Sequence, residues 1–130
     1  MMRKLAVALI LVLGAPIALA STVEEQAKQS LEMWEPNEVR VDGESLTVIS
    51  KERRITDQIY RAMLVSGLCM GTLPRPNSLD GVSEIRILNQ FGRQGYVFDG
   101  GAEECEEINN MPANETEIYV LGRTHMHTNQ

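Results

Sequence analysis

Apolar side chains recur at helical spacing in two segments, 23–34 and 51–68. Thr22 and Glu25 fit a capping box at the start of the first, in which each side chain accepts a hydrogen bond from the other residue's amide. Ser50 fits the N-cap of the second segment. Its wide apolar face predicts the central helix of the core.

Apolar and polar residues alternate over 39–48, which predicts a β-hairpin. A two-residue turn at 42–43 would place a charged residue opposite Val41. A four-residue loop over 42–45 instead pairs Val41 with Leu46 and puts four apolar side chains on one face. We prefer this second register, because a one-residue slip would turn the apolar set toward solvent.

The remaining pattern predicts a second hairpin over 84–98, a short acidic helix over 102–109 and a last strand over 117–122. The stretch 72–81 is rich in turn-forming residues. It is the longest loop, and so a candidate binding surface, although a simple connection is the commoner role. Two interpretations stay open for the tail, 123–130: a disordered end, or a continuation of the last strand.

Residues 1–20 have the three parts of a secretory signal peptide: a basic start, an apolar run over 5–13 and small residues at Ala18 and Ala20. The apolar run is too short to span a membrane. We therefore expect cleavage before Ser21 and a periplasmic or secreted protein without a membrane anchor. The mature chain, 21–130, suits one small domain.

These elements predict an α+β fold. About five strands, from two hairpins and the last strand, would form a mainly antiparallel sheet. Two to three helices would pack against this sheet.

Removing the leader lowers the formal charge from −6 to −8, because twelve basic residues become ten against eighteen acidic ones. An acidic chain is a poor nucleic-acid ligand, since Lys and Arg contacts to phosphate supply most of that affinity. The charge favours a basic partner, such as another envelope or secreted protein, or serves solubility alone.

Cys69 and Cys105 are the two cysteines of the chain. In an oxidising compartment an even pair predicts a disulfide. This bridge would close a loop of about 36 residues and stabilise the fold by about 3–4 kcal/mol in the chain-entropy model. The alternative is a reactive thiol, but the C-x-x-C redox pattern is absent from the sequence.

Three clusters are candidates for chemistry or binding. His125 and His127 would share one face of a strand, yet a metal site usually needs a third protein ligand, so no metal and no cofactor is predicted. The acidic helix could bind calcium or a cationic partner, or be a solvated face. Polar groups at the tip of the second hairpin form a candidate interface: Asn89, Gln90, Arg93 and Gln94.

The sequence carries no catalytic signature that we recognise. Small size, acidity and a predicted disulfide favour a non-enzymatic exported binding module, such as an inhibitor, an immunity-like protein or an envelope accessory protein. The alternatives are a small thiol- or metal-dependent enzyme and a small-molecule carrier.

Overall fold

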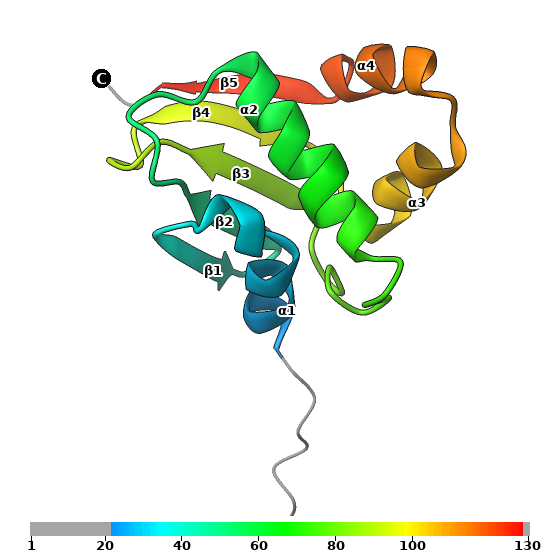
Figure 1. Cartoon of the computed structure of the whole chain (residues 1–130), viewed down its shortest axis with the longest axis horizontal. Helices are drawn as coiled ribbons and strands as arrows, with labels where there is room; N and C mark the ends of the chain where they lie inside the picture. Colours follow the sequence, from blue (N-terminus) through cyan, green and yellow to red (C-terminus); the bar gives the residue numbers. More distant parts are fainter. Residues whose placement is uncertain (1–21, 129–130) are drawn as a thin grey trace, which may run out of the picture.

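The computed structural model describes residues 22–128, and the predicted leader lies outside this part of the chain. It has an α+β fold, in which helices pack on one face of a five-stranded sheet (Figure 1). The elements in chain order are α1 (Val23–Ser30), the 3₁₀-helix η1 (Glu32–Trp34), β1 (Glu38–Asp42), β2 (Ser45–Ile49), α2 (Asp57–Arg61), the π-helix η2 (Ala62–Cys69), β3 (Glu84–Leu88), β4 (Gln94–Phe98), α3 (Ala102–Asn110), α4 (Ala113–Leu121) and β5 (Thr124–Thr128).

The sheet is mixed, and its strands follow one another in chain order from β1 to β5. β2 and β3 are parallel, and the other three neighbouring pairs are antiparallel. A parallel pair needs a crossover connection. The continuous helix formed by α2 and η2 supplies it by running across one face of the sheet (Figure 1).

The register predicted for the first hairpin is confirmed, because Val41 pairs with Leu46. The ladder runs one pair further than predicted, since Asp42 pairs with Ser45. The turn therefore has two residues rather than four. It begins at Gly43, whose φ of 62° lies in the left-handed region that favours glycine.

The central helix begins later than predicted, at Asp57 rather than after Ser50. Its N-cap is Thr56, whose hydroxyl accepts a hydrogen bond from a main-chain amide one turn on. The Gln94 side chain bonds both the N–H and the carbonyl of Ile55, each at 2.8 Å. This distant contact fixes the segment before the helix in a non-helical conformation.

The last strand was predicted over 117–122, and this prediction is wrong. The segment belongs to the helix α4, and the strand β5 lies in the predicted tail instead. The run of four apolar residues, 118–121, suits either structure. The helix brings Arg123 one turn from Tyr119, where its guanidinium lies 3.8 Å from the ring centroid. Only Val120 of α4 is buried.

The core lies between the sheet and the α1 and α2–η2 helices. Gly67 allows η2 to approach α1 closely, because a Cβ there would lie 2.8 Å from a methyl group of Leu31. Tyr60 packs on Tyr96, and its hydroxyl is 2.7 Å from that of Thr124. Within residues 22–128, no helix is both long enough and apolar enough to cross a membrane.

Candidate functional site

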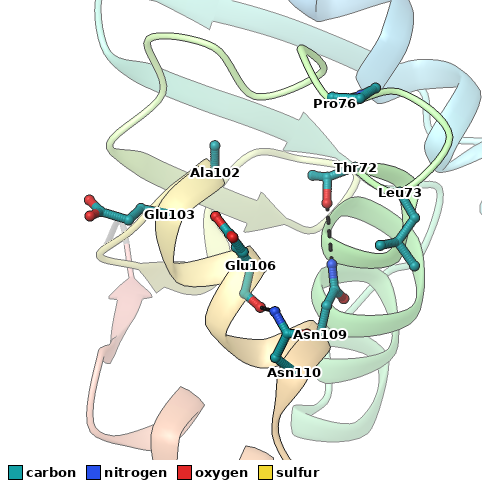
Figure 2. Close-up of a pocket in the computed structure, with 8 residues that line it drawn as sticks. All are labelled: Thr72, Leu73, Pro76, Ala102, Glu103, Glu106, Asn109 and Asn110. Atoms are coloured by element: carbon teal, nitrogen blue, oxygen red, sulfur yellow. Dashed lines mark hydrogen bonds between the residues drawn. The ribbon is translucent and has the colours of Figure 1, made fainter.

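A groove of about 460 Å³ lies between α3 and the loop that follows η2. Figure 2 shows its two walls, one from the helix and one from the loop. The lining residues are Thr72, Leu73, Pro76, Ala102, Glu103, Glu106, Asn109 and Asn110. The sequence indicated the loop over 72–81 and the acidic helix over 102–109 as separate binding candidates. It did not predict that they form one groove.

The predicted disulfide between Cys69 and Cys105 is present, and it joins the end of η2 to the middle of α3 beside this groove. The Asn109 amide adds a second tie, because it donates to the carbonyl of Cys69 at 2.9 Å and to the hydroxyl of Thr72 at 3.2 Å. The Thr72 hydroxyl in turn donates to the Cys69 carbonyl at 2.7 Å. The two walls are thus fixed relative to each other before any ligand arrives.

The start of α3 is held by a close backbone contact. A Cβ at Gly101 would lie 1.8 Å from the carbonyl oxygen of Val82, so only glycine fits there. The Glu104 carboxylate accepts a hydrogen bond from the Gly101 amide at 2.9 Å. This carboxylate cap satisfies an amide that the helix leaves without an intrahelical acceptor.

The four glutamates of α3 divide into two pairs with different surroundings. Glu104 caps the helix, and Glu107 accepts a hydrogen bond from the Tyr119 hydroxyl of α4. Glu103 and Glu106 line the groove instead. Neither of these two carboxylates takes part in an ion pair among the described residues.

The loop wall is apolar where the helix wall is charged. The apolar side chain of Leu73 is 66% exposed to solvent, and Pro76 on the same wall is exposed too. An elongated side chain with an apolar stem and a cationic end would contact both walls at once. The arrangement therefore suits lysine or arginine better than a purely apolar ligand.

The hairpin tip predicted as an interface is partly occupied by internal hydrogen bonds. Asn89 is 6% exposed, and its side chain bonds the amides of Arg93 and Gln94 and the carbonyl of Arg53. Together with the bonds from Gln94 to Ile55, these contacts hold the tip and the segment before α2 in place. Gln90 and Arg93 lie at the same tip, where Arg93 is exposed, and their binding role stays a prediction.

His125 and His127 both belong to β5, and they lie on the sheet face opposite to that of Thr124, whose hydroxyl contacts Tyr60 of α2. The Nδ1 of His125 lies 3.2 Å from a carboxylate oxygen of Asp99. Over residues 22–128, no group of three or more metal-ligating side chains comes together. Within these residues the two histidines gain no third ligand, and the absence of a metal site there stays a prediction.

The groove could not be located from sequence, because its walls are separated by about thirty residues of chain. The best available signal was the predicted disulfide, because Cys69 directly follows the predicted central helix and Cys105 lies in the predicted acidic helix. Comparison of the chain with protein families, characterised proteins and solved structures finds no match.

Proposed function

We propose that this protein is an exported, non-enzymatic binding module that holds a cationic segment of a partner protein in the groove beside α3. The single observation that carries the proposal is the pair Glu103 and Glu106, which line a preformed groove without an ion-pair partner among residues 22–128.

Electrostatics supports a cationic ligand. Two glutamates three residues apart on a helix repel each other, and a bound cation would relieve that repulsion. The mature chain, with a formal charge of −8, would also attract a basic partner over longer distances and speed its association. Leu73 on the facing wall offers contact to the methylene groups of the bound side chain.

The disulfide supports both export and a rigid groove. Disulfides persist in oxidising compartments, which agrees with the signal-peptide pattern. Rigid walls reduce the ordering cost of binding. Both cysteines of the chain are in this bridge, so neither thiol is available to act as a nucleophile.

The test is an NMR titration of the isotopically labelled protein with a short peptide of alternating lysine and leucine. We expect amide shifts at Thr72, Leu73, Glu103 and Glu106, with a dissociation constant on the order of 1 mM or below for a few charge contacts. The double variant E103Q/E106Q should weaken binding at least about tenfold.

The control variant E32Q/E115Q makes the same change in net charge at two exposed glutamates outside the groove, and it should bind like the original protein. A peptide of alternating glutamate and leucine should cause no shifts. If the basic peptide shifts amides over the whole acidic surface, and both double variants weaken it equally, the groove is not the binding site.

A further inference from the structure

β5 forms one margin of the sheet, and among the described residues it pairs with β4 alone (Figure 1). The Asp99 amide donates to the carbonyl of Arg123, directly opposite, at 2.8 Å. Opposite residues in an antiparallel ladder alternate between hydrogen-bonded and non-bonded pairs. His125 and His127 therefore bond to β4.

By the same alternation, the backbone N–H and C=O groups of Thr124, Met126 and Thr128 point away from the sheet.

The opposite margin is protected in two ways. α1 packs beside β1, and the carboxylate of Glu24 accepts a hydrogen bond from the amide of Val41 at 2.8 Å. β1 also carries three charged side chains in five residues, a common protection of natural edge strands. β5 contains no lysine, carboxylate or proline, and α4 contacts it from the end where the strand begins rather than along its outer edge (Figure 1). Its outer edge is thus the one suited to strand addition.

The sequence of β5 reads the same in both directions: Thr, His, Met, His, Thr. We propose that β5 pairs with β5 of a second copy of this chain, antiparallel, around a two-fold axis at Met126. Each residue then meets one of its own kind: Thr124 faces the partner's Thr128, His125 faces the partner's His127, and Met126 faces the partner's Met126.

The alternation of outward-facing and inward-facing backbone groups along β5 agrees with this register. A two-fold axis at Met126 makes Met126 with its symmetry mate a hydrogen-bonded pair, because their outward N–H and C=O groups face each other. Thr124 and Thr128 carry the other outward groups, and they meet each other across the axis. A shift by one residue would place the inward-facing groups of His125 or His127 at the interface instead.

A second copy fits this edge better than an unrelated strand, because the palindromic sequence of β5 pairs every residue with one of the same type when two copies meet antiparallel. The two sheets would continue into one, with both helical layers on the same side. Met126, 66% exposed in the single chain, would be covered by its symmetry mate. The contact is small, so the association should be weak and concentration-dependent.

The test is sedimentation velocity on protein purified after expression of the whole chain, over about 10 µM to 1 mM, where small interfaces associate. We expect a monomer–dimer equilibrium. The variant Met126→Lys places two ammonium groups opposite each other across the axis and should weaken dimerisation at least about tenfold. Met33→Lys makes the same change at an 83% exposed site on η1 and should dimerise like the original protein.

Amide hydrogen exchange supplies a second readout that does not depend on the variants. At high protein concentration the amides of Thr124, Met126 and Thr128 should become protected, while those of His125 and His127 are protected at every concentration. A protein that stays monomeric at 1 mM overturns the proposal. A dimer in which the three outward amides gain no protection overturns it too.

Discussion

At the scale of single residues, polar side chains fix the relative positions of segments that the apolar pattern of the sequence does not place. Asn89, Gln94 and Asn109 each tie together segments that are far apart in sequence. The sequence marked the first two as hydrogen-bonding groups and offered them as a binding surface. It could not show their internal bonds to Arg53 and Ile55, because those partners depend on the fold.

Asn109→Ala should lower the free energy of unfolding by about 0.5–1.5 kcal/mol, because its hydrogen bonds to the Cys69 carbonyl and the Thr72 hydroxyl are lost while the Thr72 hydroxyl still donates to that carbonyl. Asn110→Ala is the matched control, since its amide bonds only the exposed carbonyl of Glu106 in its own helix, and it should cost less than about 0.5 kcal/mol. Urea unfolding measures both. Equal effects of the two variants would show that Asn109 does not fix the groove.

The Tyr119 hydroxyl gives the fold a pH dependence. Burial, followed by the hydrogen bond to Glu107, raises the pKa of Tyr119 to about 12, and burial also raises the pKa of Tyr60. In the unfolded chain both groups titrate near about 10. As the pH rises from about 10 to 12, the unfolded chain loses protons that the folded chain keeps, so the free energy of unfolding falls.

Tyr119→Phe should make this fall smaller, because it removes one of the two shifted groups. Urea unfolding at several pH values in that window measures the slope. An unchanged slope in the variant would contradict the shifted pKa of Tyr119.

At the scale of elements, the sequence pattern correctly predicted the hairpins and the helix cap that depend on neighbouring residues. Alternation and turn residues predicted both hairpins, including the register of Val41 with Leu46, and Thr22 caps α1 through its hydroxyl as predicted. The segment before Asp57 is held by a contact from β4, and Tyr119 of α4 contacts Glu107 of α3. A short apolar run carries neither kind of information, so these two elements were misplaced.

The disulfide is the element-scale tie with the largest expected effect. Replacing both cysteines, Cys69→Ala with Cys105→Ala, should lower the free energy of unfolding by about 3–4 kcal/mol, because it frees a loop of about 36 residues in the unfolded chain. Urea unfolding of the double variant and of the oxidised protein measures the difference. A loss below about 1 kcal/mol would contradict the expected loop-closure contribution.

At the scale of the whole molecule, net charge acts on the two proposed interactions in opposite directions. The sequence predicted the α+β class, the disulfide and the acidic balance, and the described structure has the first two. It could not predict the groove or the unprotected β5 edge. Both arise from the packing of distant segments. β5 lies in residues that the sequence analysis assigned to the tail, after a segment that it predicted as the last strand.

Salt should therefore separate the two proposals. Raising ionic strength should weaken binding of the lysine–leucine peptide, because screening reduces attraction to Glu103 and Glu106. The same change should strengthen dimerisation through β5, because two copies of an acidic chain repel each other. Peptide titration and sedimentation velocity at low and high salt measure the two responses. Responses of the same sign would contradict one of the two electrostatic accounts.

The most direct test of the central claim is photo-crosslinking from the groove in the native cells. A photoreactive amino acid in place of Leu73 should crosslink to a basic protein, and the product should disappear in E103Q/E106Q but persist in E32Q/E115Q. A crosslinked product that persists without the two groove glutamates, or no product from Leu73 at all, would contradict a cation-binding groove.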